Sequence, residues 1–299
     1  PYTTLFRSTC VKAPMTRTRA FINMHIATVF FGLSGVFAAL IPASAISVVW
    51  GRTAIAVVVL FGVCCLKKRL PWQGVSKSEI AQLLGIGCLL GVHWWSFFYA
   101  IQLGGVAIGT LGFSCFPAAI AIIEAVVFKD RISKLELALI GLITIGLILV
   151  TPSFDFANQA TIGLLWGIFS GVIYAVIAAC NRVGAAKRQA SSLQACWWQF
   201  FAISVVTAFA APQLSGLNGM GWLWLFGLGV LCTGLAYWLF IDSLSAINAR
   251  TAAMIFALEP VYAIAIAWVF LHDVPSFRML LGGSLIIAAV VAAARFKSS

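Results

Sequence analysis

Charged residues are scarce in this sequence, and acidic residues are the scarcest. Asp and Glu together number 8 among 299 residues, and all charged residues make up 9% of the chain, whereas hydrophobic residues make up 62%. A soluble protein needs a largely polar surface, and this composition cannot supply one. The sequence therefore excludes a soluble globular domain and indicates a protein that lies in lipid.

Several motifs are also missing. The 8 cysteines include no CxxC pair, so neither a zinc site nor a disulfide framework is indicated. There is no nucleotide-binding glycine loop, which excludes direct ATP coupling, and no HExxH or GxSxG pattern of a hydrolase. We therefore expect no cofactor, no metal and no catalytic residue. The net charge of +11 lies in short clusters between apolar segments, which argues against a nucleic-acid partner.

Long apolar segments dominate what remains. They run for about 18 to 24 residues, the length that an α-helix needs to cross a hydrocarbon core roughly 30 Å thick. The short alternating strands of an outer-membrane barrel are absent. The sequence thus predicts an all-α polytopic membrane protein with ten transmembrane helices. The expected spans are residues 21–41, 46–66, 80–101, 105–128, 135–151, 161–181, 192–211, 221–241, 249–271 and 279–296.

Lys and Arg indicate the orientation of these spans. If the N-terminus is cytoplasmic, the loops on that side and the two tails hold every basic residue except Arg52, inside a span, and Arg278, in an opposite loop. Because positive charge collects in cytoplasmic loops, we expect a multi-pass protein of the inner (cytoplasmic) membrane with both termini in the cytoplasm. The lipid bilayer is then a partner, and nothing in the sequence requires an oligomer.

The two halves of the chain resemble each other. Residues 97–133 and 240–276 align without a gap, with Pro117 matching Pro260. Each half contains five spans, an odd number, so the halves must insert with opposite topology as two inverted five-helix repeats. Shorter echoes pair Ser34 with Ser170, Trp50 with Trp197 and Arg52 with Gln199. The expected domains are an N-terminal tail over residues 1–20, a first repeat over 21–151, a linker over 152–160 and a second repeat over 161–296.

The beginning of the tail has a separate interpretation. Residues 1–14 look like translated adapter DNA, and they lack the long apolar core of a signal peptide. Met15 is the start that we expect. Mass spectrometry of the native N-terminus tests this hypothesis.

With these features in place, the sequence resembles the drug/metabolite transporter superfamily, and within it the ten-helix EamA-type branch. The stretches that carry the resemblance are WGRTA, HWWSFFYAIQLGGVAIGTLGFSCFP and LEPVYA. The resemblance covers about residues 21–295. It implies a secondary transporter that works by alternating access around a central cavity lined mainly by helices 1–4 and 6–9. It also implies that the substrate is a small organic metabolite, such as an amino acid or a related compound, and that transport is mostly outward.

Ionisable residues inside the spans are the first candidates for the site, because each costs at least about 2.5–3.5 kcal/mol at the centre of a bilayer. Glu259 lies near mid-membrane before Pro260, which tends to kink a helix. We expect Glu259 to bind substrate and to couple transport to protons; the alternative is a protonated side chain bonded to a neighbouring helix. Arg52 would bind a substrate carboxylate with its planar fork, or else its side chain would extend to the outer interface.

Aromatic residues and one histidine complete the predicted substrate-binding set. The rings would stack on a flat or apolar substrate or shelter an ammonium group, and core packing is the alternative. The histidine would shuttle a proton or bond across helices. These predicted residues are His93, Trp94, Tyr99, Tyr237 and Trp238.

Two further features are expected to be structural. Glu124 lies near the cytoplasmic end of its span, where interfacial pairing with basic neighbours is favoured. Gly163, Gly167 and Gly171 recur every fourth residue, which predicts a close-packing helix face.

Other functional classes compete with a transporter. A membrane-embedded enzyme would need a nucleophile and a base in a definable motif, and a receptor or passive facilitator would not require matched inverted halves or a mid-membrane Glu-Pro pair. Uptake into vesicles with and without a substrate gradient distinguishes these classes.

Reporter fusions test the predicted topology. Fusions after Lys77, Lys134 and Arg188 should report the cytoplasm, and those near Ala43 and Gln159 should report the outer side, because loops rich in Lys and Arg stay inside. A cytoplasmic signal from Gln159 would invert the second half and contradict the inverted-repeat arrangement.

Overall fold

The computed structural model describes residues 16–129, 131–151, 155, 157–185, 189–243, 246–247, 252, 255–256 and 258–296. Every regular element among these residues is a helix, and no strand occurs in them. The all-α prediction is therefore confirmed. Residues 1–15 of the expected tail lie outside the described residues, and so do residues 152–154 and 156 of the expected linker.

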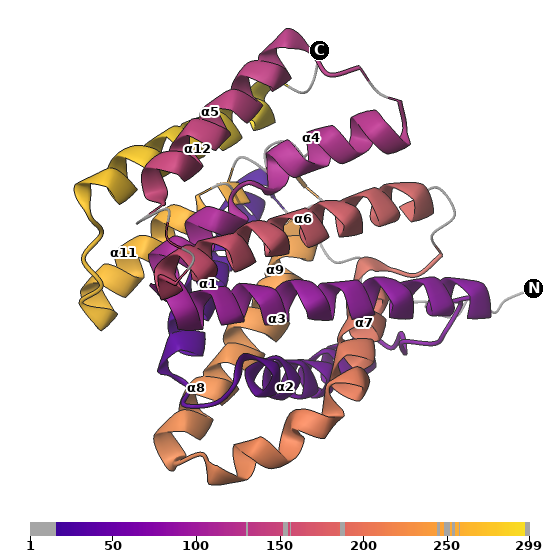
Figure 1. Ribbon diagram of the computed structural model, residues 1–299. Coiled ribbons are helices and arrows are strands. Elements are labelled where there is room, and N and C mark those ends of the chain that lie inside the picture. The colour runs from indigo at the N-terminus through magenta and orange to yellow at the C-terminus, as the bar shows by residue number, and fades with distance from the viewer. Residues whose placement is uncertain are drawn as a thin grey trace, which may run out of the picture.

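Helices of the first half follow the five spans expected there (Figure 1). Serine or threonine caps start several of them; the Ser133 side chain, for example, bonds to the Glu136 backbone while the Glu136 carboxylate bonds back, an arrangement that satisfies helix-end donors. The elements are α1 (Arg17–Leu40), α2 (Ala45–Leu66), α3 (Lys77–Phe113), α4 (Phe116–Val127) and α5 (Lys134–Val150).

The chain reverses direction within α3. Gly105 has φ of 82°, a conformation that glycine adopts at little cost. After the turn the chain packs back on itself, since a Cβ on Gly109 would lie 3.1 Å from the Ile101 backbone nitrogen. α3 therefore contains the third span and the start of the fourth, and α4 completes the fourth after a break at Ser114 and Cys115.

The second half contains more irregular helices. In the expected seventh span, the 3₁₀ helix η1 follows α7 at an angle of 71°. A π-helical turn, η2, interrupts the eighth span. The ninth span, expected over 249–271, is described in part, and α11 forms its second portion. The elements are α6 (Gln159–Ala185), α7 (Ser192–Val206), η1 (Ala208–Gly216), α8 (Gly219–Gly229), η2 (Val230–Leu235), α9 (Ala236–Ser243), α11 (Glu259–Leu271) and α12 (Phe277–Phe296).

Length and composition agree with a multi-pass membrane protein. Among the described residues, five helices are long and apolar enough to cross a membrane, and the bent pair α7 and η1 gives a sixth. Four expected spans remain. The shorter apolar helices α4, α11 and α12 lie in the fourth, ninth and tenth of them, and α5 lies in the fifth. The ten-helix architecture is thus supported.

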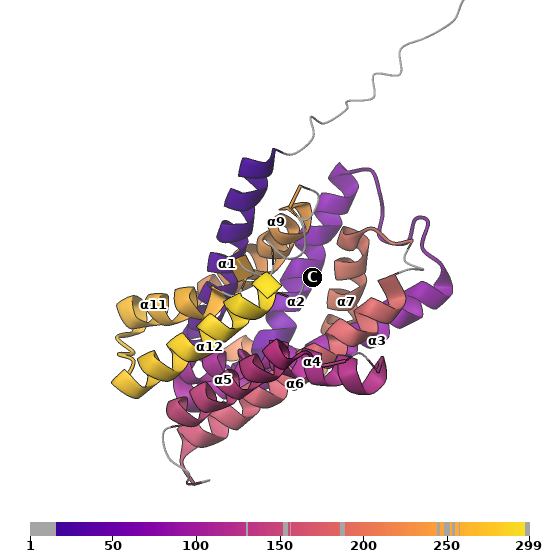
Figure 2. The same cartoon turned by 90° about the horizontal axis from the view of Figure 1, so that it is seen from above.

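Equivalent helices occupy equivalent places in the two halves. Pro117 is the second residue of α4 and Pro260 the second residue of α11, where a missing backbone N–H is tolerated. The equivalent helices α2 and α7 pack on each other, and so do α5 and α12. α3 packs along α6, and the eighth span, which is equivalent to the third, packs along α1. Figures 1 and 2 both show α5 and α12 side by side at one edge of the bundle. Such matching contacts between equivalent helices are expected when the two halves have related folds.

The predicted glycine face on α6 is confirmed. A Cβ on Gly163 would lie 2.8 Å from the Gly104 backbone nitrogen, and one on Gly167 would lie 2.7 Å from the Gly109 carbonyl oxygen. Only glycine lets the backbones of α3 and α6 approach this closely, as small residues do between membrane helices. The close approach joins the sixth span to the end of the third span and to the beginning of the fourth.

Replacing Gly167 with valine should destabilise the protein, because the side chain would overlap the α3 backbone and overpacking costs about 1–3 kcal/mol or more. The matched control is Gly141→Val, since no atom lies within 4 Å of a Cβ at Gly141. Heating detergent-solubilised protein and measuring the monodisperse fraction gives the apparent Tm. Equal Tm values for the two variants would contradict the packing argument.

Candidate functional site

A cavity of about 70 Å³ lies at the centre of the helix bundle. Side chains from α1, α2, α3, α6, α9 and α11 line it. Neither α5 nor the described side chains of α12 contribute to it, in line with the arrangement that the family resemblance implies. α7 also contributes none; its Phe200 instead contacts the outer side of the rings of Trp94 and Tyr237. The cavity has room for a few water molecules, and it must widen to hold an organic molecule.

Most of the predicted substrate-binding residues lie around this cavity. They come from spans far apart in the sequence, so the fold brings together residues that the sequence could only name one by one. The predicted residues that line the cavity are Arg52, His93, Trp94, Tyr237 and Glu259.

Tyr99 and Trp238 do not line it. The Tyr99 ring stacks on Trp95 at 6.1 Å between centroids, and it lies one helical turn from Trp95, on the same face. That face points away from the one that carries Trp94. Trp238 lies under the Lys67 ammonium group, 5.7 Å from the ring centroid. Substrate contact is therefore not expected for these two rings in this arrangement.

Arg52 is held inside the bundle. It is 2% exposed, so its side chain does not extend to the membrane surface. Its Nε donates a 2.9 Å hydrogen bond to Thr233 Oγ1, and its guanidinium carbon lies 4.2 Å from the Trp94 ring centroid and 5.0 Å from that of Phe98. Within the described part of the chain, Nη1 and Nη2 have no acceptor.

Glu259 begins α11 at the edge of the same cavity and is 7% exposed. Its carboxyl group forms no hydrogen bond or ion pair with a described residue. A second cavity of about 10 Å³ touches it from the side of Phe113 and Pro260. Arg52 and Glu259 thus face one cavity with opposite formal charges and without pairing to each other.

His93 bonds across helices, one of the two alternatives expected for it. Ser170 Oγ donates to the His93 carbonyl at 3.0 Å and lies 2.7 Å from His93 Nδ1. His93 Nδ1 also lies 3.2 Å from the Ser170 carbonyl oxygen, which can only accept, so we assign the ring proton to Nδ1. This network assigns the tautomer and leaves Nε2 as an acceptor.

The aromatic walls of the cavity come in equivalent pairs. At the spacing that separates Pro117 from Pro260, Trp94 matches Tyr237, and these two rings meet edge to face at 5.9 Å. Two phenylalanine pairs have the same sequence separation. Because equivalent residues of both halves line it, the cavity lies between the two halves. These pairs, whose members all line the cavity, are Phe97 with Phe240 and Phe113 with Phe256.

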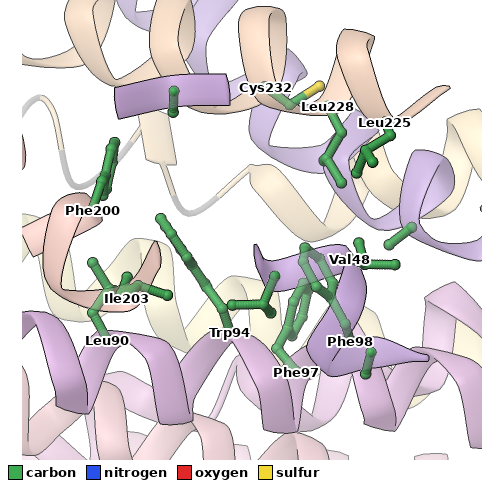
Figure 3. Close-up of a cluster of buried hydrophobic side chains, with 14 of the residues drawn as sticks. Val48, Leu90, Trp94, Phe97, Phe98, Phe200, Ile203, Leu225, Leu228 and Cys232 are labelled. Atoms are coloured by element: carbon green, nitrogen blue, oxygen red, sulfur yellow. The ribbon is translucent and has the colours of Figure 1, made fainter. Parts of the chain in front are cut away.

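The side chains around Trp94 close one side of the cavity. Figure 3 shows Trp94, Phe97 and Phe98 projecting from α3 beside Val48, with Leu228 on the neighbouring helix. All five belong to the main apolar core. Arg52, which is 2% exposed, is thereby shielded from lipid and reaches only the cavity.

Sequence reasoning missed several cavity residues. One of them is Tyr174 of α6, whose ring lies 5.3 Å from the rings of both His93 and Phe116. No motif marks Tyr174. The repeat could have predicted the phenylalanine pairs, because the two members of each pair are as far apart in the sequence as Pro117 and Pro260. The cavity residues that were not predicted are Phe31, Ser34, Phe97, Phe113, Tyr174, Phe240 and Phe256.

Known proteins resemble this chain over nearly its whole length. An uncharacterized transporter of Bacillus subtilis, YxxF, is 23% identical over 280 residues, which cover 92% of this chain and 89% of that protein. A pseudopaline exporter of Pseudomonas aeruginosa, CntI, is 22% identical over 264 residues, covering 87% and 88%. One solved crystal structure superposes with a TM-score of 0.64 at 19% identity, covering 95% of this chain and 100% of the other, which shows a shared fold.

The two halves also match one protein family. The model of the EamA-like transporter family matches residues 18–151 and again residues 161–295. These two matches correspond to the two sets of helices that pack in equivalent ways. The chain therefore belongs to the EamA-like transporter family, whose members are multi-pass membrane transporters.

Proposed function

We propose that this protein exports a small zwitterionic metabolite with an apolar body, an amino acid or a related compound, by alternating access. One observation carries the proposal: Arg52 and Glu259 face the same buried cavity, and neither forms an ion pair with a described residue. The walls between them are mostly aromatic.

A zwitterion matches this arrangement because it satisfies both charged side chains at once. A charge buried without a partner costs several kcal/mol, and a bound counter-charge offsets that cost. The substrate carboxylate would bind the Arg52 guanidinium, which suits a planar carboxylate. The substrate ammonium would bind Glu259, with aromatic faces such as Tyr174 nearby. An anion without an amine would leave Glu259 unmatched.

Alternating access follows from the repeated halves. Two inverted repeats can exchange conformations, so that the cavity opens to one side and then to the other. The Pseudomonas relative is an exporter, which supports outward transport. The distribution of Lys and Arg supports an inner-membrane location with both termini in the cytoplasm.

The proposal is tested by identifying the substrate. Metabolites of cells with and without the gene are compared, and each compound whose distribution changes is then loaded into vesicles that contain the purified protein. Protein-dependent release of a zwitterion supports the proposal. Release of only anions or only cations would contradict the assigned substrate class.

Arg52→Lys should reduce transport of the identified substrate about tenfold or more at equal membrane expression. An ammonium group cannot form the bidentate contact of a guanidinium, and hydrogen bonds to charged groups contribute about 1.5–3 kcal/mol. The measurement is release from preloaded vesicles. The control is Arg278→Lys at an exposed position outside the cavity, which should behave as wild type. Near-normal release by Arg52→Lys would remove Arg52 from the binding site.

Glu259→Gln should abolish substrate accumulation driven by a pH gradient while leaving membrane insertion intact, because the amide keeps size and hydrogen bonding but cannot exchange a proton. Accumulation in reconstituted vesicles is measured across pH 6 to 8. Glu124→Gln, within α4 and outside the cavity, is the control. If the Glu259 variant accumulated substrate like wild type, Glu259 would have no coupling role and another group would have to exchange the proton. If wild type itself showed no accumulation driven by the pH gradient, the protein would be a facilitator.

A further inference from the structure

A π-helical turn lies directly against Arg52. Between Val230 and Leu235 the eighth span changes from α to π register as η2, a change that is rare and often found at functional sites. Glycines on both sides of this turn let it approach α2: a Cβ on Gly229 would lie 3.2 Å from the Arg52 carbonyl oxygen, and one on Gly234 would lie 2.9 Å from a Val59 methyl carbon. The π-helical turn thus packs closely against α2 beside Arg52.

Thr233 is the residue of this turn that contacts the Arg52 side chain. Its hydroxyl donates to the Leu228 carbonyl, five residues earlier, at 2.8 Å. In a regular α-helix a threonine hydroxyl would instead bond to the carbonyl four residues earlier. A hydroxyl has one proton, so the oxygen that donates to Leu228 can only accept from Arg52 Nε, at 2.9 Å. Thr233 is fully buried.

This bond decides which edge of the guanidinium is free. A carboxylate can bind arginine in a bidentate manner at the Nε side or end-on at Nη1 and Nη2. The Nε–H group already donates to Thr233, and the Trp94 ring covers one face of the guanidinium. The remaining donors are Nη1 and Nη2, on a side chain that lines the cavity.

We propose that Thr233 is a positioning residue for substrate recognition: it holds Arg52 by Nε, so that a substrate carboxylate binds end-on at Nη1 and Nη2. This inference rests on the proposed function, in which Arg52 binds the carboxylate. Thr233 itself does not touch the substrate.

The hydrogen bond is tested first, without any substrate. Protein labelled with ¹⁵N-arginine is studied by NMR, and the Nε–H signal of Arg52 is assigned by its loss in Arg52→Lys. The signal should exchange slowly with water in wild type and in Thr233→Ser, and it should shift and exchange faster in Thr233→Val, which keeps the size of threonine but lacks the hydroxyl. An unchanged signal in Thr233→Val would overturn the inference while leaving the proposed function standing.

The effect on recognition is measured by release from vesicles. The probes are leucine, phenylalanine and tryptophan, of which the one with the lowest KM is used, and its methyl ester, which lacks the carboxylate. Thr233→Val should raise the KM of the acid about tenfold or more, as expected for loss of a hydrogen bond to a charged group, with kcat changed by less than about twofold. Thr233→Ser should restore KM to within about threefold, and the ester should be transported alike by wild type and Thr233→Val.

Two controls separate positioning from a general structural role. Thr53 is also fully buried next to Arg52, but its hydroxyl bonds only to backbone carbonyls; Thr53→Val should leave KM unchanged. In an Arg52→Lys background, Thr233→Val should add no further loss, because both changes remove one interaction. Equal losses for acid and ester, or additive losses, would overturn the positioning role. If wild type transported none of the three amino acids, the proposed substrate class would fall, and the NMR result would still decide the Thr233–Arg52 bond.

Discussion

Removal of polar groups from water inside the bilayer is the constraint on which this structure depends. Backbone groups must therefore form hydrogen bonds within helices. Polar side chains must find partners too: the hydroxyls of Thr28 and Thr110 donate to carbonyls four residues earlier in their own helices. Such bonds are local and satisfy each group within its span. Arg52 and Glu259 differ, because the free edge of the guanidinium and the carboxyl group meet no described partner. These exceptions identify the place where a ligand can contribute binding energy.

Symmetry and asymmetry have different roles around the cavity. The aromatic walls are built from equivalent positions of the two halves, as the contact between Trp94 and Tyr237 shows. Walls of this kind remain similar when the halves exchange conformations, which alternating access requires. The polar groups break the symmetry: the position equivalent to Glu259 is Phe116, and Gln199 echoes Arg52. A symmetric scaffold therefore presents one group of each formal charge, and the proposed zwitterionic substrate would have one preferred orientation between them.

Sequence alone predicted the features that depend on local composition. Hydropathy and the spacing of Pro117 and Pro260 were sufficient for the helical class and the repeat, and the cost of burying charge was sufficient to single out Arg52 and Glu259. Features set by neighbouring helices were out of reach. The aromatic run in α3 covers more than one face, so only packing could show that Trp94 faces the cavity and Tyr99 does not. The π turn at Thr233 depends likewise on the close approach of α2.

The two charged residues belong to differently connected helices. α2 carries Arg52, and hydrogen bonds connect its first turn and the loop that follows it to the second half. Gln213 accepts from Ser44 and Ser47, and Gln194 donates to the carbonyls of Leu70 and Gln73 in the loop. Glu259 instead lies on α11, which packs closely on α1; a Cβ on Gly32 would lie 3.2 Å from the Glu259 carbonyl oxygen. Relative movement of these two helix groups changes the separation of the charges. In the proposed mechanism a zwitterion that bridges Arg52 and Glu259 stabilises the conformation whose separation fits it, and substrate binding is thereby linked to the conformational change, since a ligand shifts an equilibrium only by its different affinity for the two states.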